Sequence, residues 1–516
     1  MLTLTGLQDI IRIVLHLSSV LTCDKSRNQQ AMGTTEQRHG AADISIAAPL
    51  LPTPAMDPAQ EPPRRNVFAF ICATLASMTT ILMGYNLALM SGAELFMRED
   101  LGLTDEQVEV LSGSMNLFML ASILAAGWAA DAIGRRGTIV LANAFLIAGA
   151  LAMSLGGSYA VLLAARFVTS VGVGFAVVVA PVYAAEIAPA SARGMLSSLP
   201  EIFVNAGILL SYISNYAFAG LPLPLGWRAM FAAGVAPPVL LAAGVVLAMP
   251  ESPRWLAMRG RDGEAEAVLS RTSGSPAEAG HRLREIKQDA VAAEGDGAGR
   301  DLLAGASPPV MIRRILTDVI ALQFFHQASG IDIIVLYSPL VFKQAGISSN
   351  TSVLAATVAV GAVKTGFILV ATLFSDRVGR RPLLLGSTAG MAVALTSLAI
   401  TLLCAASVTT TAACVACLLA YVAAFSVGIG PLTQTYSAEI LPLRLRARGT
   451  SLGTAVNRLT CGVLSMTFIS LADYISMAGC FFLYAGAAAA ACVFVYLRLP
   501  ETRGRSLEDM VQLFSM

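Results

Sequence analysis

The sequence predicts an all-α membrane protein with twelve membrane-spanning helices in two halves of six. Of its 516 residues, 56% are hydrophobic and only 13% are charged, and a soluble chain of this length would expose more charge than that. Stretches without Asp, Glu, Lys or Arg are repeatedly long enough to cross about 30 Å of hydrocarbon, which takes about 20 residues of helix. Three short motifs also occur twice in the same order, which indicates two related halves.

The charge-free stretches delimit the expected helices. The first half contains six, the fifth of them interrupted by Glu201: 66–93, 110–130, 137–165, 167–185, 194–227 and 229–250. The second half contains six more, two of them in one long stretch: 319–342, 351–375, two within 382–438, 449–472 and 474–497.

The hydrophilic segments complete the domain organisation. Residues 1–65 are a polar, Pro-containing tail that we expect to be disordered. The two six-helix halves occupy 66–250 and 315–498. Between them, 251–314 is expected to form a central loop with short helices, and 499–516 is a C-terminal tail.

The distribution of Lys and Arg predicts the orientation, because these residues collect in cytoplasmic loops. They are concentrated in the central loop, near both ends of the apolar region, and after the second and fourth helices of each half. The first loop on the opposite side, 92–109, carries only Arg98 against six acidic residues. We therefore expect a multi-pass protein in the lipid bilayer, with both termini and the central loop in the cytoplasm.

The polar residues outside these loops give no sign of an enzyme. Cys414 and Cys417 form a CxxC pair, but both lie in an apolar span without a second pair nearby, which favours packing over metal binding. No phosphate loop, nucleophile constellation or metal cluster stands out. We expect no catalytic residues, no cofactor, no metal and no nucleic-acid partner.

The repeated motifs follow corresponding helices of the two halves. "GWAADAIGRRG" (127–137) returns as "TLFSDRVGRRP" (372–382) after the second helix of each half. "YAAEIAPASARG" (183–194) returns as "YSAEILPLRLRARG" (436–449) after the fourth, and "PESPRW" (250–255) returns as "PETRGR" (500–505) after the sixth. Parallel six-helix repeats place a substrate site between the halves near the bilayer midplane.

Acidic and arginine residues in these motifs are candidate cytoplasmic gates. Partly exposed ion pairs are worth about 1 kcal/mol each, so they can form when the halves close on that side and separate when the halves open. Alternatively, they are topology determinants and helix caps. The expected groups are Asp131 with Arg135 and Arg136, Asp376 with Arg380 and Arg381, Glu186 with Arg193, and Glu439 with Arg446.

The chain resembles the sugar porter family of the major facilitator superfamily from about residue 67 to about residue 510. The resemblance rests on an ordered set of motifs: Gly84-Tyr85, Asp131 with Gly134-Arg135-Arg136, Arg166-Phe167, Pro181-Val182-Tyr183 with Glu186, "PESPR", "HQASGID" (326–332), Gly430-Pro431 and Pro500-Glu501-Thr502. Residues 199–218, 327–339 and 358–365 are similar to the plant polyol transporters. The resemblance implies a major facilitator fold and proton-coupled uptake of linear polyols and monosaccharides across the plasma membrane.

Charged residues at membrane depth are candidates for the substrate site, since they are costly there and usually face the bundle interior. A polyol offers only hydroxyl groups, so its site needs carboxylates, carboxamides and ammonium groups around a slot. The candidates, each at a place where the resemblance implies polar substrate contacts, are Glu201, Asn205, His326, Gln327, Asp332, Lys364 and Asn457.

Several of these candidates have a structural alternative. Glu201 and Asn205 lie one helical turn apart and can face the same cavity, or they form a buried structural pair. Asp332 binds substrate, or it forms an ion pair with Lys364. On a straight seventh helix Gln327 and Asp332 would not share a face, but Gly330 can let the outer half bend.

Three residues depart from the pattern of the family. Proton-coupled members carry Asp at the place of Asn86, next to the arginine that is Arg166 here, and facilitative members carry Asn; an amide cannot titrate. His326 stands where the family usually has Gln, so it restores a proton site or donates one hydrogen bond. Gln434 replaces an aromatic residue, usually Trp, that would stack on a sugar.

Three functions follow from these residues. Proton symport of polyols or monosaccharides, with the proton as a second partner, is the expectation from the resemblance. Facilitated diffusion is the alternative that Asn86 favours. A non-transporting sensor or decayed paralogue is a further alternative, although the intact gate motifs in both halves argue against it.

Overall fold

The computed structural model describes residues 67–188, 193–295, 310–405, 407–441 and 446–502. Contacts divide the chain into two units, Met1–Pro63 and Arg64–Met516, and the description below concerns the second. The expected tail 1–65 and most of the tail 499–516 lie outside the described residues. Every regular element in the described part is a helix, which confirms the predicted all-α class.

The first half of the chain is built from seven labelled helices, several of which join into one span. The break between the first two lies at Thr79 and Thr80, whose backbone groups bond to the preceding turn. Their bounds are α2 (Val67–Met78), α3 (Ile81–Leu101), α4 (Asp105–Leu155), α5 (Tyr159–Ile187), α6 (Arg193–Phe218), α7 (Leu223–Ala233) and α8 (Ala236–Ala248).

The helix α4 consists of two helices that meet at Gly134. This glycine has a φ of 85° and a ψ of 168°, a conformation that residues with a Cβ rarely adopt. Both ends of α4 lie near α7, because Arg228 of α7 binds Asp100, just before α4, and Ser154, near its end, donates to the Arg228 carbonyl. The chain therefore reverses at Gly134 and crosses the bundle twice.

The second half repeats this construction with more breaks. Gly330 interrupts the seventh span with a φ of 86°, and Gly428 interrupts the tenth. The bounds are α12 (Val310–Ala328), α13 (Ile331–Gln344), α14 (Asn350–Val378), α15 (Arg380–Leu403), α16 (Val408–Val427), α17 (Ile429–Ile440), α18 (Arg446–Ser465), α19 (Phe468–Ile475) and α20 (Met477–Arg498).

Three helix boundaries inferred from charge are wrong. Arg166 does not end the third span but lies inside α5, where its side chain is buried. Arg228 does not separate the fifth and sixth spans, since α6 ends at Phe218 and α7 already contains Trp227. The segment 92–109 is mostly helical, and Glu94 and Glu109 are buried in α3 and α4. Charged side chains that find partners inside the protein do not mark loops.

The helices present an apolar surface that only lipid would cover. Large apolar side chains stand outside the bundle, with Leu124 78%, Leu247 86% and Leu403 67% exposed. Within the described residues, nine spans are long and apolar enough to cross a membrane, or ten with the bent pair of α18 and α19. The 51-residue α4 supplies two crossings, and α6, whose polarity is raised by Glu201, is long enough for another.

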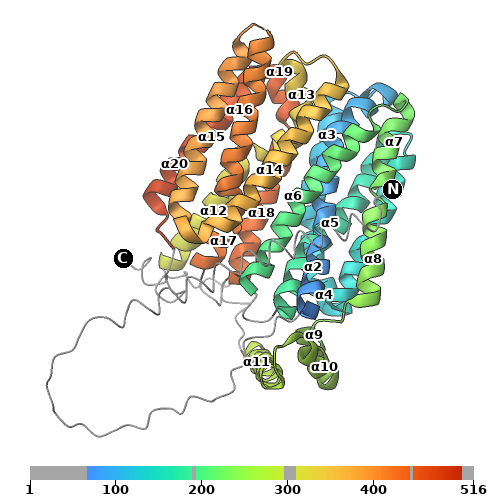
Figure 1. Ribbon diagram of the computed structural model, residues 1–516, viewed down its shortest axis with the longest axis vertical. Helices are drawn as coiled ribbons and strands as arrows, with labels where there is room; N and C mark the ends of the chain where they lie inside the picture. Colours follow the sequence, from blue (N-terminus) through green and yellow to red (C-terminus); the bar gives the residue numbers. More distant parts are fainter. Residues whose placement is uncertain (1–66, 189–192, 296–309, 406, 442–445, 503–516) are drawn as a thin grey trace, which may run out of the picture. The chain divides into compact units, whose positions relative to one another are not determined.

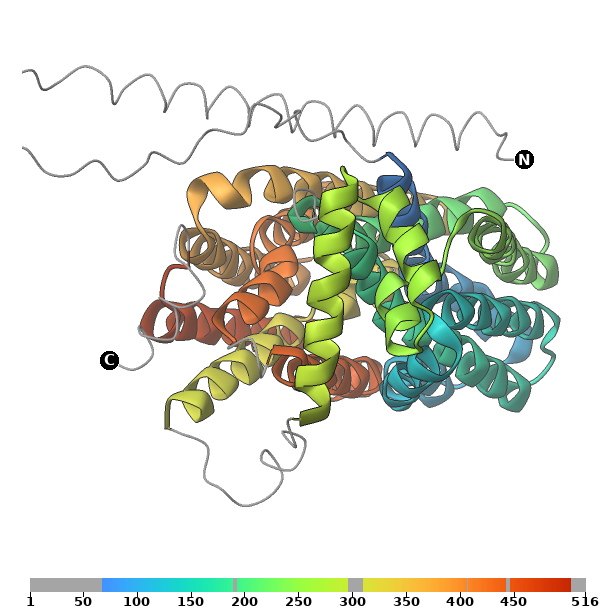
Figure 2. The ribbon, with the colours of Figure 1, turned by 90° about the horizontal axis from the view of Figure 1, so that it is seen from below.

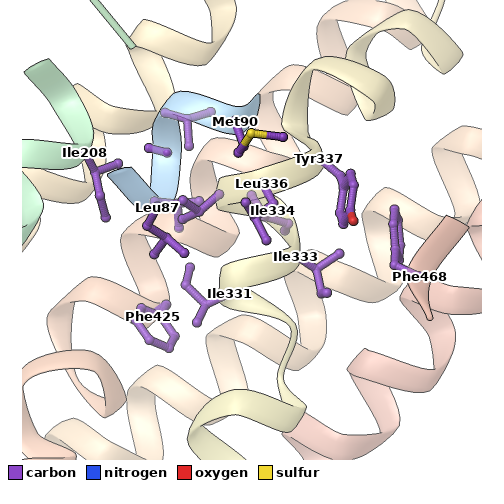
Figure 3. Close-up of a cluster of buried hydrophobic side chains, with 14 of the residues drawn as sticks. Leu87, Met90, Ile208, Ile331, Ile333, Ile334, Leu336, Tyr337, Phe425 and Phe468 are labelled. Atoms are coloured by element: carbon purple, nitrogen blue, oxygen red, sulfur yellow. The ribbon is translucent and has the colours of Figure 1, made fainter. Parts of the chain in front are cut away.

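The helices of each half gather together, α2–α8 on one side and α12–α20 on the other (Figure 1). The halves meet where α3 packs on α13, α4 on α18 and α19, and α6 on α14. Apolar side chains of α3, α6 and α13, among them Leu87, Met90, Ile208 and Ile334, fill this junction (Figure 3).

Three short helices follow the first half: α9 (Pro253–Met258), α10 (Asp262–Thr272) and α11 (Pro276–Gly295). Seen from below, α10 and α11 lie across the end of the bundle (Figure 2). This is the end that contains Gly134 and Gly379, and we call it the Gly134 end. The opposite end contains the start of α4 and the whole of α19, and we call it the Glu109 end.

Candidate functional site

A network of buried amides joins α12 to α18 in the second half. The Asn457 amide nitrogen donates to the Gln323 side-chain oxygen (3.1 Å) and lies 3.1 Å from Nδ1 of His326. The Asn457 side-chain oxygen accepts from Nε2 of Gln327 (3.1 Å). Asn457 therefore fixes the orientation of three polar side chains on one helix, two of which, Gln323 and Gln327, are fully buried.

The break at Gly330 brings Asp332 into this network. Gln327 lies at the end of α12 and Asp332 at the start of α13, yet Nε2 of Gln327 donates to Oδ2 of Asp332 over 3.1 Å. The same carboxylate oxygen accepts from the Cys461 thiol at 2.9 Å. A straight helix would separate the two side chains, so the left-handed backbone of Gly330 is what unites them, as expected from the sequence.

Glu201 and Asn205 form the part of the site that belongs to the first half. Nδ2 of Asn205 donates to the Glu201 carboxylate (3.2 Å), one turn earlier in α6. Asn205 is buried, whereas Glu201 is exposed. The Asn205 carbonyl accepts from the Thr365 hydroxyl of α14 (3.1 Å), so this pair lies directly at the junction of the halves.

Lys364 carries a positive charge to the same junction. Its ammonium lies 5.9 Å from the centre of the Phe425 ring, and the centre of the His326 ring lies 5.1 Å from the centre of the same ring. No carboxylate of the described residues lies within 4.0 Å of the Lys364 nitrogen, so the alternative of a direct ion pair with Asp332 is not present in this conformation. Lys364 and Arg458 act on Glu201 and Asp332 at longer range.

Three buried hydrogen-bonding atoms of the site have no partner among the described residues. These atoms are Oε1 of Gln327, Oδ1 of Asn205 and Nε2 of Gln323. Buried polar atoms normally find a partner, and a hydroxyl group can both accept from an amide and donate to a carbonyl oxygen. The arrangement can therefore bind a ligand rich in hydroxyl groups.

Two members of the network were missed by the sequence interpretation. Gln323 precedes Gln327 by one helical turn, and Cys461 follows Asn457 by one turn. The signal that could have identified them is this spacing of four residues on helices that already carried a candidate. Gln434, in contrast, lies exposed in α17 and makes none of these contacts.

Asn86 and Arg166 meet deeper in the first half. The Asn86 side chain donates to the carbonyl of Leu82 in its own helix (2.8 Å). Arg166 donates from Nη1 to the backbone carbonyl of Asn86 (3.1 Å), while its Nε and Nη2 have no hydrogen-bond partner among the described residues. The guanidinium is thus buried beside a neutral amide rather than a carboxylate.

At the Gly134 end, Arg135 holds the first half together. It donates to both oxygens of Glu186 (3.1 and 3.2 Å) and to Asp131 (3.2 Å). Ser252 donates to the same Glu186 carboxylate at 2.5 Å. The Glu251 carboxylate accepts from the backbone nitrogens of Arg135 and of Arg136 (2.9 and 3.1 Å).

The second half contains the same arrangement. Arg380 donates to Glu439 (3.1 Å), and the Thr502 hydroxyl donates to the same carboxylate (2.6 Å). The Glu501 carboxylate accepts from the backbone nitrogens of Arg380 and of Arg381, each at 3.0 Å. The three repeated motifs therefore build one polar cluster in each half.

The ion pairs described at this end lie inside a half, so they connect helices of one half to each other. Glu186 and Glu439 pair with Arg135 and Arg380 here. Arg136 and Arg381 donate instead to the carbonyls of Val246 and Tyr496. The side chains of three expected gate residues lie outside the described residues: Arg193, Asp376 and Arg446.

Glu251 and Glu501 were not among the expected gate residues, although their contacts explain the motifs. A Cβ at Gly134 would collide with the Glu251 carboxylate, and one at Gly379 with that of Glu501. Both glycines have a positive φ, of 85° and 101°. This turn thus requires a glycine before its two arginines, because the glycine has a positive φ and lies against a glutamate from far along the chain.

At the Glu109 end, hydrogen bonds connect the two halves. The Glu109 carboxylate accepts from the backbone nitrogens of Ile469 and Ser470 and from the Ser470 hydroxyl. Tyr212 of α6 donates to the carbonyl of Val335 (2.7 Å). The two halves are therefore joined at this end and near the amide network.

No three His, Cys, Asp or Glu side chains gather as metal ligands in the part of the chain that the structure describes. The polar groups of the site are amides, carboxylates, one imidazole, one thiol and one ammonium, a donor set suited to a neutral, hydroxylated molecule.

Known proteins are similar to this chain in sequence and in fold. The family described as sugar (and other) transporter matches residues 72–514. Polyol transporter 5 of Arabidopsis thaliana is 49% identical over 475 residues, which are 88% of this chain and 88% of that protein. Glucose transporter GlcP of Staphylococcus epidermidis is 31% identical over 441 residues, 86% of this chain and 96% of that protein.

Solved structures of a bacterial transporter have the same fold. The inward-open conformation of the xylose transporter XylE from E. coli gives a TM-score of 0.74 at 24% identity, and covers 86% of this chain and 99% of that one. A second structure is described as the major facilitator superfamily proton:xylose symporter XylE bound to 6-bromo-6-deoxy-D-glucose. It gives a TM-score of 0.72 at 25% identity, and covers 87% of this chain and 99% of that one.

Proposed function

The chain belongs to the sugar transporter family of the major facilitator superfamily, and from this premise we propose that it carries polyols or monosaccharides by facilitated diffusion through alternating access. It is a multi-pass membrane protein and a sugar or polyol transporter, not an enzyme. The observation that carries the proposal is the amide network of the second half together with Asn205 of the first, where buried carbonyl and amide groups have no hydrogen-bond partner among the described residues.

The proposed substrate site combines groups from both halves. Asn457, Gln327 and His326 supply amide and imidazole contacts, and Asp332 and Lys364 supply charge. Glu201 and Asn205 lie at the junction on the side of the first half, where the Asn205 carbonyl accepts from Thr365 and the charges of Lys364 and Asp332 act on Glu201. A linear polyol presents hydroxyl groups along its whole length, so a site that spans the junction can hold it at both ends. The similarity to Polyol transporter 5 supports this substrate class.

Alternating access is supported by the contacts described at the two ends of the bundle. The Glu109 end carries hydrogen bonds between the halves, whereas the ion pairs described at the Gly134 end stay within a half. We assign the Gly134 end to the cytoplasm, because Lys and Arg collect there. Both termini are then cytoplasmic, and the plasma membrane is the proposed location. The polar clusters of Arg135 and Arg380 act as rigid parts of a cytoplasmic gate.

Facilitated diffusion is the function that position 86 supports best. A proton-coupling group must bind and release a proton next to a cation during each cycle. Asn86 cannot do so, and Arg166 contacts only its backbone carbonyl there. Substrate would then equilibrate across the membrane without accumulation.

Proton symport is the second candidate. The 25% identical neighbour is described as a proton:xylose symporter, and His326, Glu201 and Asp332 are titratable groups within the proposed site. Either function requires saturable flux. A chain that binds but never carries substrate would instead be a sensor.

Counterflow in proteoliposomes tests the carrier function directly. Vesicles loaded with unlabelled sorbitol, mannitol, myo-inositol or glucose receive the labelled compound outside. We expect transient accumulation of label with at least one of the four, because a carrier exchanges its substrate. Asn457→Ala should abolish this accumulation in vesicles that contain the same amount of protein. Ser397→Ala, which changes a partly exposed hydroxyl of α15, should not. Absence of counterflow with all four compounds would contradict the proposal.

A further inference from the structure

Glu94 is a buried acid that none of the proposed roles uses. It lies in α3, eight residues beyond Asn86, or about 12 Å along the helix. Its side chain is buried, with 7% of the residue surface exposed. The hydroxyl of Ser112 in α4, itself fully buried, donates to its carboxylate over 3.2 Å.

No cation neutralises this carboxylate at close range. Among the described residues, no Lys, Arg or His nitrogen lies within 4.0 Å of it. Arg98, one turn along α3, is bound to Asp105 (2.6 Å), and the exposed Lys343 acts on Glu94 from α13 only at a distance. Arg228 of α7 is held by Asp100.

The remaining groups packed around Glu94 are neutral or acidic. From α13, the Tyr337 hydroxyl lies near Ser112 and Glu94, and the Glu109 carboxylate of α4 acts on the same hydroxyl. From α6, Asn215 faces α3 and donates to the Leu89 carbonyl (3.3 Å). A carboxylate charge buried in such surroundings costs far more free energy than the protonated acid does.

The acid lies beneath the contact that closes the Glu109 end. Gly113, next to Ser112, packs so tightly on Ser465 and Met466 of the second half that a Cβ would collide with them. The Tyr337 hydroxyl donates to the Ser465 carbonyl (2.8 Å), and its ring stacks on Phe468 at 5.2 Å (Figure 3). Separation of the halves at this end would admit water to Glu94.

We propose that Glu94 is a proton-binding site that takes up a proton from the external solution when the Glu109 end closes and returns it to the same side when that end opens. This proposal rests on the alternating access proposed above. No proton crosses the membrane, so the proton is a ligand of the gate rather than a transported ion. Flux would depend on external pH even though position 86 cannot titrate.

Equilibrium exchange separates this effect from proton coupling. Proteoliposomes containing the full chain are set to the same pH on both sides, between about pH 5.5 and about pH 8, and exchange labelled sorbitol. Because closure requires one proton, exchange should slow as pH rises, by up to about tenfold per pH unit. Glu94→Gln keeps the shape and the Ser112 contact, and should remove the pH dependence.

Two further variants make this comparison decisive. Glu94→Asp retains a titratable group and should retain a pH dependence. Glu99→Gln removes an exposed acid of the same helix, and its profile should follow that of the unmodified protein. Exchange that is independent of pH in the unmodified protein, or a pH dependence that survives in Glu94→Gln, would overturn the proposal.

A second measurement tests the site even if sorbitol is not a substrate. In a background that carries Met466→Cys and replaces the exposed native thiol by Cys404→Ser, a membrane-impermeant maleimide applied from outside reports opening of the Glu109 end. The rate of labelling should increase with pH more steeply in this background than in the same background with Glu94→Gln added. Both proteins carry the same thiol, so the intrinsic rise of its reactivity with pH is common to both. Equal slopes would contradict the proton site. If labelled sorbitol does not exchange but the pH slopes of maleimide labelling differ between the two proteins, only the choice of substrate is contradicted.

Discussion

The carboxylate of Glu109 in α4 accepts hydrogen bonds from both the backbone nitrogen and the hydroxyl of Ser470 in α19. The two residues come from different halves of the chain and meet at the end opposite Gly134, where Glu109 is buried and Ser470 is exposed. Because the carboxylate also accepts from Ile469, it satisfies the first free nitrogens of α19. This contact must break whenever the halves separate at that end.

Glu109→Gln should therefore favour opening of the Glu109 end. A carboxamide replaces one acceptor by a donor and loses the charge, and a buried hydrogen bond to a charged group is worth about 1.5–3 kcal/mol. We expect external maleimide labelling of Met466→Cys, in the Cys404→Ser background, to increase about tenfold or more. Glu106→Gln, an exposed acid at the start of the same helix, is the control. Equal labelling of both variants would show that the contact does not hold the end closed.

Glu201→Gln should weaken substrate binding. The change retains the contact with Asn205 but removes the charge that faces Lys364 and Arg458. Glu201 is exposed in this conformation and would be covered by bound substrate, so loss of its polar contact costs about 1–3 kcal/mol, or about 5- to 150-fold in affinity. The measurement is the KM of uptake of the best substrate from the counterflow panel. Unchanged kinetics would remove Glu201 from the substrate site.

Gly134→Ala should destabilise the protein. The residue has a φ of 85° and lies against the Glu251 carboxylate, so a Cβ adds backbone strain of about 1–3 kcal/mol and displaces the acceptor of two backbone nitrogens. Gly127→Ala is the matched control, because a Cβ there meets nothing within 4 Å. Thermal unfolding in detergent should occur at a lower temperature in Gly134→Ala than in Gly127→Ala. The same melting temperature in both would refute this explanation of the motif.

Gly330→Ala should reduce the rate of transport more than it reduces the amount of protein at the cell surface. The left-handed backbone at this residue, with a φ of 86°, joins Gln327 to Asp332, and a Cβ would press on the Tyr484 ring. Gly366→Ala in α14, where a Cβ meets nothing within 4 Å, is the control. Surface-normalised uptake separates the two effects, and full uptake by Gly330→Ala would mean that the bend is not needed.

The helical class was predictable because membrane crossing imposes long apolar segments, whatever their packing. The boundaries were predictable only where charges lie in loops. Arg166 and Arg228 have partners inside the protein, so the stretches between charges misplaced the ends of two helices. Glu94 was counted with the loop acids for the same reason. Burial of a charge depends on neighbours distant in sequence, and composition alone does not contain them.

The candidate site was predictable as a set of residue types but not as a set of contacts. Glu201 and Asn205 pair through their spacing of four, which the sequence contains. The pairing of Gln327 with Asp332 depended on a bend that only the presence of Gly330 suggested. The contact of Asn457 with three residues of α12 depends on how α12 and α18 pack, which no local pattern encodes.

The central claim is that a chain with Asn86 beside Arg166 carries its substrate without concentrating it. Its most direct test is the steady-state accumulation of the counterflow substrate in transporter-deficient cells that do not metabolise it, with and without a protonophore, for the unmodified chain and for Asn86→Asp. We predict that the unmodified chain only equilibrates the substrate and is insensitive to the protonophore, whereas Asn86→Asp concentrates it. Accumulation above equilibrium by the unmodified chain, abolished by the protonophore, would contradict the claim and direct attention to His326, Glu201 and Asp332.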